Sequence, residues 1–313
     1  MQRLGWAAFA LGAAGMAAAP MVLGRGDLFL LIEILVVIAL AQSWNLLAGY
    51  GGLLSLGHHA FVGVGGYALF VVTRDLPVNP YLMVPLAGFF AGALALALAP
   101  ILFRLRDVYF AVGMWVAAEA LRIVAIRWDF IGGASGLPLY AARALTRATM
   151  TMNTYWLALG IAVGMTVLVG WMMAGTFGLR LRALRDDEVA ARSIGVGPGA
   201  VRLTVFVVSA IGAGIAGAVS FLAAAFINPS AAFDVNWVVT VVFVTIIGGI
   251  GRLSGPFLGA ALYFALRETL AFSASWYLVA LGVTAMLVML LAPGGLAGIV
   301  DSLWQRLRPR RSA

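Results

Sequence analysis

GLRLRALRDDEVAARSIGVGPG, residues 178–199, is the most informative part of this chain about its fold. It places four arginines and the consecutive acids Asp186, Asp187 and Glu188 between two long apolar segments. A charged side chain at the centre of a bilayer costs about 2.5–3.5 kcal/mol on insertion scales, so this stretch must lie in water on one side of a membrane. The apolar segments on either side of it are therefore expected to cross that membrane.

The composition of the whole chain supports this interpretation. Of the 313 residues, 63% are hydrophobic and only 10% are charged, against roughly 25% charged in soluble domains. The apolar runs are continuous, whereas strands of a membrane β-barrel alternate apolar and polar positions. We expect an all-α, polytopic membrane helix bundle that forms a single transmembrane domain over residues 1–313, with a cytoplasmic loop at 178–200.

Several classes of chemistry are excluded by residues that the chain lacks. There is no cysteine, hence no disulfide or thiolate metal site, and all twenty basic residues are arginine. A phosphate-binding P-loop requires lysine, so we expect no cofactor on this chain and expect any ATP to be hydrolysed by another chain. The only histidines, His58 and His59, are adjacent and point in different directions on a helix, which disfavours a metal site. The sequence has no Ser/His/Asp constellation of the kind that would indicate an enzyme.

Ten apolar runs are long enough to cross the roughly 30 Å of bilayer hydrocarbon. They lie near residues 4–23, 28–48, 53–73, 81–103, 108–127, 154–174, 201–225, 235–250, 255–272 and 276–292. A cleaved signal peptide is the alternative for the first run, but Pro20 directly after Ala17–Ala19 favours an uncleaved helix.

The distribution of arginine sets the orientation of these spans. If residues 178–200 are cytoplasmic, thirteen arginines fall in cytoplasmic segments and four fall outside, as the positive-inside rule requires. Both termini are then cytoplasmic. This asymmetry explains the net charge of +8 better than a nucleic-acid partner does.

A short sequence match suggests an internal repeat. Leu54-Ser55 precedes Phe61-x-Gly63-x3-Tyr67, and Leu253-Ser254 precedes Phe257-x-Gly259-x3-Tyr263. A match this short is explained equally well by chance and by an internal repeat. The common span order and direction in the two halves are typical of a parallel repeat of the transporter kind.

The loop at 178–200 has the signals of a short helix. The three acids suit the first turn, Arg192 suits the last turn, and Gly195 suits the position just past the end. Leu184, Val189, Ala190 and Ile194 are expected to share a small apolar face. A helix that docks on another protein and an ordinary solvated connector both fit this pattern, and we favour docking.

Two features of the predicted spans leave alternatives open. The third span is rich in glycine, which fits either a broken helix that lines a cavity or simple close packing. Glu119 and Arg122 are spaced to neutralise each other on one helix face, whereas Glu33 has no obvious local partner. Such charges suit a proton relay, but structural pairing is the interpretation that we favour.

Several stretches resemble the M-type permease subunit of branched-chain amino acid ABC importers. They are AQSWNLLAGYGGLLSLGHHAFVGVGGY (41–67), LRDVYFAVGMWVAAEALRIVAIRWDFIGGASGL (105–137), RALRDDEVAARSIGV (182–196), IIGGIGRLSGPFLGAALY (246–263) and LAPGGLAGI (291–299), in the family's order. The resemblance implies a transmembrane permease domain in the bacterial inner membrane.

The resemblance also implies site residues. Those that couple to the ATPase would be Arg182, Arg185, Asp186, Glu188, Ala190, Ala191 and Gly195. Residues near the translocation pathway would be Asn45, Ser55, Gly57 and His58, and Glu119 and Arg122 match the family's Glu-x-x-Arg pair. His59 and the glycines after Phe61 depart from the family pattern, which leaves urea or short amides as alternative substrates.

The partners implied are a related H-type permease in a heterodimer, two ATPase subunits that use the ATP, an extracytoplasmic substrate-binding protein, and membrane lipid. The rival hypothesis is a secondary transporter driven by a proton or sodium gradient through Glu33, Glu119 and Glu268.

Overall fold

The computed structural model describes the whole chain except residues 1, 77, 141–146, 271–273, 293 and 308–313. Its elements are, in chain order, α1 (Gln2–Val22), α2 (Arg25–Trp44), the π-helical η1 (Asn45–Tyr50), α3 (His59–Asp75), the 3₁₀ turn η2 (Pro80–Met83), α4 (Val84–Leu102), α5 (Val108–Arg127), the 3₁₀ turns η3 (Asp129–Ile131) and η4 (Gly133–Ser135), β1 (Leu137–Pro138), α6 (Arg147–Ala174), α7 (Thr176–Asp186), α8 (Glu188–Ser193), α9 (Pro198–Ala224), β2 (Phe226–Ile227), α10 (Pro229–Ala232), α11 (Asn236–Gly249), α12 (Gly255–Leu270), α13 (Ala274–Leu291) and α14 (Gly295–Leu307).

A helix lies within each of the ten predicted apolar spans. Six helical segments in the described part of the chain are long and apolar enough to cross a membrane: 25–50, 80–102, 108–127, 148–174, 198–224 and 229–249. The chain is therefore an all-α polytopic membrane protein.

Two predicted boundaries differ from the structure. The third span was expected to begin at 53, but α3 begins at His59 and residues 51–58 are not helical. Gly52 has a left-handed backbone with φ +70°, which ends the preceding helix at this point. The sixth span was expected to begin near 154, whereas α6 extends back to Arg147.

The centre of the bundle is formed by α2 and α9, the two spans with the largest buried share. α9 packs mainly against α3 and α4, and α2 packs mainly against α6. Small residues permit these close approaches, because a Cβ added at Gly65 of α3 would lie 2.2 Å from the Gly214 carbonyl oxygen of α9. Backbone contact of this kind takes the place of the hydrophobic effect inside a membrane.

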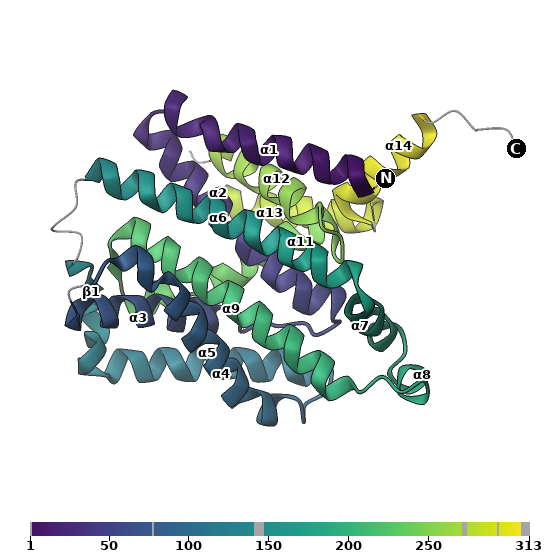
Figure 1. Ribbon diagram of the computed structural model, residues 1–313, viewed down its shortest axis with the longest axis horizontal. Helices are drawn as coiled ribbons and strands as arrows, with labels where there is room; N and C mark the ends of the chain where they lie inside the picture. The colour runs from purple at the N-terminus through teal and green to yellow at the C-terminus, as the bar shows by residue number, and fades with distance from the viewer. Residues whose placement is uncertain (1, 77, 141–146, 271–273, 293, 308–313) are drawn as a thin grey trace, which may run out of the picture.

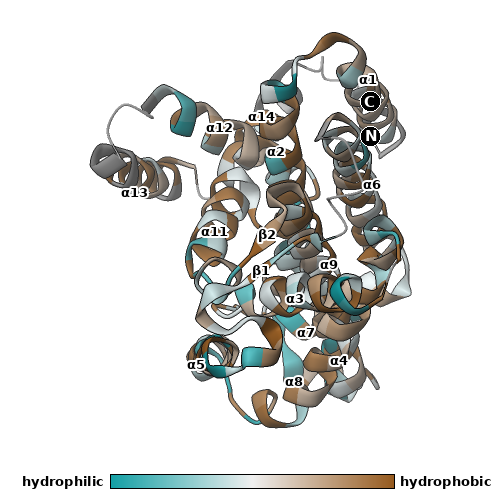
Figure 2. Ribbon diagram, turned by 90° about the vertical axis from the view of Figure 1, so that its left-hand side faces the viewer, coloured by the Kyte–Doolittle hydropathy of each residue, from teal (hydrophilic) through white to brown (hydrophobic). Residues whose placement is uncertain are grey.

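The two ends of the bundle are distinct. The start of α1 and the helices α7, α8 and α14 lie together at one end (Figure 1). The short antiparallel pair β1–β2, in which Leu137 pairs with Ile227, lies at the other end. Seen from the β1–β2 end, α5, α11 and α13 lie along one side of the molecule, and α13 projects away from the main body (Figure 2).

Candidate functional site

The non-helical residues 51–58 form a segment, here called the 51–58 segment, that turns back beside the end of α2. The indole Nε1 of Trp44 donates a hydrogen bond of 2.8 Å to the Ser55 carbonyl oxygen. A Cβ added at Gly57 would lie 1.9 Å from the Met114 carbonyl oxygen in α5, so only glycine fits this contact. The predicted third span therefore starts with a non-helical segment, and its helix α3 begins only at His59.

His58 ends this segment in a fully enclosed position, with 1% of its surface exposed. The Ser209 hydroxyl donates to the Ser43 carbonyl oxygen at 2.6 Å and lies 3.3 Å from His58 Nε2. Because the hydroxyl has a single proton, His58 Nε2 is the donor in the second contact. The imidazole therefore attaches the start of α3 to α9 and, through the Ser209 hydroxyl, to α2.

Asn45 attaches the end of α2 to the turn between α11 and α12. Its Oδ1 accepts from the Gly251 backbone N–H at 2.8 Å, and its Nδ2 donates to the Arg252 carbonyl oxygen at 2.9 Å. One turn earlier, Gln42 Nε2 donates to the Leu253 carbonyl oxygen at 2.8 Å. These contacts form the α2 clamp, which holds the turn over residues 251–253.

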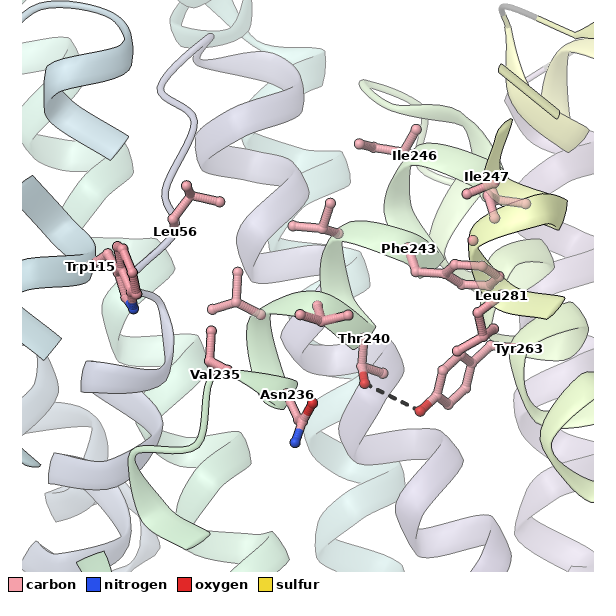
Figure 3. Close-up of a pocket in the computed structure, with 15 residues that line it drawn as sticks. Leu56, Trp115, Val235, Asn236, Thr240, Phe243, Ile246, Ile247, Tyr263 and Leu281 are labelled. Carbon is pink, nitrogen blue, oxygen red and sulfur yellow. Dashed lines mark hydrogen bonds between the residues drawn. The ribbon is translucent and has the colours of Figure 1, made fainter. Parts of the chain in front are cut away.

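An apolar cavity of about 820 Å³ opens between the 51–58 segment, α5, α11, α12 and α13 (Figure 3). Leu56 and Trp115 line one side and Phe243, Tyr263 and Leu281 line the other. Its polar groups are few and lie near the start of α11: Asn236, and Thr240, whose hydroxyl is 3.2 Å from the Tyr263 hydroxyl. This volume and this balance of apolar and polar groups are typical of small-molecule sites.

The charged loop contains two helices rather than the single one expected. α7 ends at Asp186 and α8 begins at Glu188, because Asp187 is extended and its carboxylate accepts from the backbone N–H groups of Val189 and Ala190. At the other end, Gly195 has φ +83° and donates to the Arg192 carbonyl oxygen. Val196 donates to Ala191, which completes a Schellman motif.

The expected apolar face over this loop does not form. Leu184 is buried in α7, whereas Val189 and Ile194 are 78% and 75% exposed. Ala191 is buried and Ala190 is exposed. The break at Asp187 divides these residues between two helices, so Val189 of α8 and Ile194 just past its end are exposed while Ala191 is buried.

Glu188 fixes α8 to the bundle. Its carboxylate accepts from Arg192 at 2.5 Å and from Arg202 at the start of α9 at 2.7 Å. Partial burial alone would raise the pKa of Glu188, but the hydrogen bonds from Arg202 and Arg192 outweigh that effect and hold the pKa below its usual value.

Arg185 connects α7 to the membrane helices. Its Nη1 donates to the Gly49 carbonyl oxygen in η1 at 2.7 Å, while Asp186 lies 3.8 Å from its Nε. Arg182 makes a longer contact of 3.4 Å to the Met173 carbonyl oxygen. Arg185 is thus the residue by which α7 contacts the π-helical end of α2.

The three glutamates of the membrane helices α2, α5 and α12 lie next to arginines. Glu119 and Arg122 form the ion pair that their spacing predicts, with Nε–Oε distances of 2.9 and 3.0 Å. Glu33, which has no local partner in sequence, pairs with Arg267 of α12, where Nη2 lies 2.8 Å from Oε2. Arg267 also lies 3.5 Å from Glu268. Pairing of all these acids favours a structural role over a proton relay.

The residues with an expected pathway role are enclosed rather than exposed to the cavity. Asn45, Ser55, Gly57 and His58 are all buried, and the cavity is lined instead by Leu56 of the same segment. Trp115, Phe243 and Tyr263 were missed by sequence reasoning. No local pattern marks them, because aromatic residues are common throughout the apolar spans.

Comparison with known proteins identifies the family. The model of the family described as "Branched-chain amino acid transport system / permease component" matches residues 26–292. This range begins at the second residue of α2 and ends at the residue after α13. The chain belongs to this family. It is therefore a multi-pass permease subunit of an ATP-driven ABC importer in the inner membrane, and ATP is hydrolysed on a separate subunit.

Two curated relatives of this permease family are similar over most of the chain. Both are named "High-affinity branched-chain amino acid transport system permease protein LivM", from Salmonella typhimurium and from Escherichia coli. Each is 26% identical over 303 residues, which cover 88% of this chain and 71% of the relative. No solved structure matches the chain.

Proposed function

We propose that this permease carries branched-chain amino acids through a pathway that includes the apolar cavity. The observation that carries the proposal is the lining of that cavity, in which Leu56, Trp115 and Phe243 suit an aliphatic side chain. Asn236 and Thr240 supply the few polar groups near one rim. The names of the two relatives support the same substrate class.

The assembly that we propose is a heterodimer with an H-type permease, two ATPase subunits and an extracytoplasmic binding protein. Ten helices would cross the membrane, with both termini in the cytoplasm and a parallel internal repeat. The start of α1 lies at the same end of the bundle as α7, α8 and α14, which supports placing both termini on the side of the charged loop. No cofactor is proposed for this chain, since ATP would be used by its partners.

The proposed route of coupling begins at α8. Exposed Val189 and Ile194 would contact the ATPase, with Arg182, Asp186, Glu188, Ala190, Ala191 and Gly195 shaping or flanking that surface. Arg185 would then transmit displacement of α7 to the Gly49 carbonyl oxygen. Asn45, Ser55, Gly57 and His58 would position the 51–58 segment, so that movement of η1 alters the cavity at Leu56.

The decisive experiment is uptake of labelled leucine into vesicles that contain this chain with its partners and binding protein. Uptake that requires internal ATP and the binding protein supports the proposal. Uptake driven by an imposed proton or sodium gradient without ATP would support the secondary-transporter alternative through Glu33, Glu119 and Glu268. Competition by urea or short amides in place of isoleucine and valine would reassign the substrate.

Coupling is tested by the double variant Arg185→Ala/Glu188→Ala. We expect it to insert into the membrane normally, while ATP hydrolysis no longer drives uptake. Arg180→Ala is the matched control, because Arg180 lies on α7 and is not among the residues with a described contact to η1 or α9. Normal coupling in the double variant would remove the docking role from α7 and α8.

A further inference from the structure

A second cavity, of about 900 Å³, lies at the α8 end of the bundle and is here called the α8 cavity. It is bordered by residues 52–54 of the 51–58 segment, the connection from α4 to α5, the first turn of α5, and side chains of α8 and α9, and much of its lining is exposed. Glu188 and Val189 also belong to the proposed coupling route, but residues 105–108 and the other apolar side chains of the cavity do not.

The lining of the α8 cavity divides into an apolar part and an ionic part. Leu53, Leu54, Val108 and Phe110 belong to the apolar part. The ionic part contains the guanidinium groups of Arg106, Arg192 and Arg202 and the carboxylates of Asp107 and Glu188. A ligand that fits both parts carries an apolar group next to charges of both signs.

Two of these charges are available to a ligand. Glu188 is already neutralised by Arg192 and Arg202. Within the described part of the chain, neither Arg106 nor Asp107 has an ion-pair partner, although they are adjacent in sequence. A carboxylate and an ammonium group on one small molecule would satisfy both.

The backbone of Asp107 is unusual in a way that suits this role. It has φ +47° and ψ −115°, and although it precedes α5 its carboxylate makes no capping hydrogen bond to that helix. Residues other than glycine rarely adopt positive φ, and such strain is found preferentially at functional positions. In this conformation the Asp107 carboxylate makes no hydrogen bond to α5, so it can bind a ligand in the cavity.

The α8 cavity and the apolar cavity lie along the same two elements. Leu56 and Trp115 line the apolar cavity, whereas residues 52–54 and Val108 line the α8 cavity. Beside Leu56 and Trp115, Gly57 is in close backbone contact with Met114. The α8 cavity is therefore reached from its exposed side, where Val108 and Val189 lie.

We propose that the α8 cavity is a second binding site for an amino acid with an apolar side chain, open to the cytoplasm, and that its occupation slows transport. Arg106 binds the carboxylate, Asp107 binds the ammonium group, and the apolar part receives the side chain. Because Glu188 and Val189 belong to the same lining, a bound amino acid restrains α8 against the displacement that coupling requires. The choice of ligand rests on the proposed function.

Binding is tested first, by equilibrium dialysis of labelled L-leucine against the detergent-solubilised importer without ATP or binding protein. We expect Arg106→Gln and Asp107→Asn each to weaken binding about ten-fold or more, as loss of a charged hydrogen-bond partner implies. Arg104→Gln, two residues away and outside the cavity lining, should bind as the wild type does. Leucinamide and N-acetylleucine, which each lack one charge, should compete poorly.

Asp107→Gly separates charge from backbone strain. Glycine relieves the positive φ but removes the carboxylate, so it should bind as weakly as Asp107→Asn while folding at least as well as the wild type. Wild-type affinity in Asp107→Gly, or unchanged affinity in Arg106→Gln, would overturn the proposal. This readout does not depend on uptake, so it remains informative if the importer proves not to transport leucine.

Regulation is tested in vesicles that enclose ATP with or without unlabelled leucine. Internal leucine should slow wild-type and Arg104→Gln uptake several-fold, and it should have little effect on Arg106→Gln. An Arg106→Gln variant that loses uptake and ATP hydrolysis equally with and without internal leucine would show that this cavity receives the ATPase, and would overturn the proposal.

Discussion

Asn45→Ala should destabilise the protein far more than Gln42→Ala, although both side chains hold the same turn. Asn45 makes two hydrogen bonds, to Gly251 and to Arg252, and is fully buried. Each bond contributes about 0.5–1.5 kcal/mol net, and a stranded backbone partner adds about 1–3 kcal/mol. Because the two backbone partners are only partly buried, we expect a total loss of about 2–4 kcal/mol.

Gln42 makes one hydrogen bond, through Nε2, and its buried Oε1 has no partner among the described residues. Replacing it with alanine removes that unsatisfied acceptor together with the bond, so the net cost is about 1 kcal/mol or less. The two variants therefore differ by the second hydrogen bond and by the stranded groups on the turn.

The assay is thermal unfolding in detergent, followed by the fluorescence of the nine tryptophans at one fixed heating rate. At about 2 °C per kcal/mol, the midpoint should fall by about 4–8 °C for Asn45→Ala and by about 2 °C or less for Gln42→Ala. Equal shifts, or a larger shift for Gln42→Ala, would refute the reasoning that the paired hydrogen bonds of Asn45 stabilise this turn.

Three further outcomes are expected. Gly259→Ala should sharply reduce the yield of folded protein on size-exclusion chromatography, because its Cβ would lie 1.8 Å from the Val244 carbonyl oxygen; a normal yield would contradict that contact. Arg267→Gln should lower expression more than Glu33→Gln, because it strands the Glu33 carboxylate and leaves Glu268 without its neighbour, whereas Arg267 in Glu33→Gln keeps Glu268 3.5 Å away. Combining the two substitutions should restore expression in part if the pair is structural. The pKa of Glu188 is lowered in the folded protein, so the stability that its ionised carboxylate contributes is present at neutral pH and is lost as pH falls through that lowered pKa. The difference in unfolding midpoint between wild type and Glu188→Gln should therefore be constant near neutral pH and vanish in acid.

Local signals in the sequence predicted the helical spans and much of the charged loop. A helix lies within each predicted apolar span because continuous apolar runs of this length satisfy their backbone groups in a bilayer only as helices. Gly195 ends α8 with a positive φ, and Glu119 pairs with Arg122 three residues away. Each of these features depends on residues that are neighbours in the chain.

The same local signals were insufficient where one segment meets another. The expected apolar face of the loop did not form, because Asp187 caps a separate helix and divides the face between α7 and α8. The start of α3 was displaced to His59, because the 51–58 segment is held by Trp44 and by the backbone of α5.

Hydropathy and local motifs were enough to predict the membrane class, the approximate positions of the helices and the chemistry available to the loop. Three features depend on how the helices pack and could not be predicted. Glu33 pairs with Arg267 across 234 residues, Asn45 holds the turn at Gly251, and two cavities lie along the 51–58 segment. The physical reason is that hydropathy and capping act over a few residues. Partners of distant polar groups, and the space left between helices, depend on how whole helices pack.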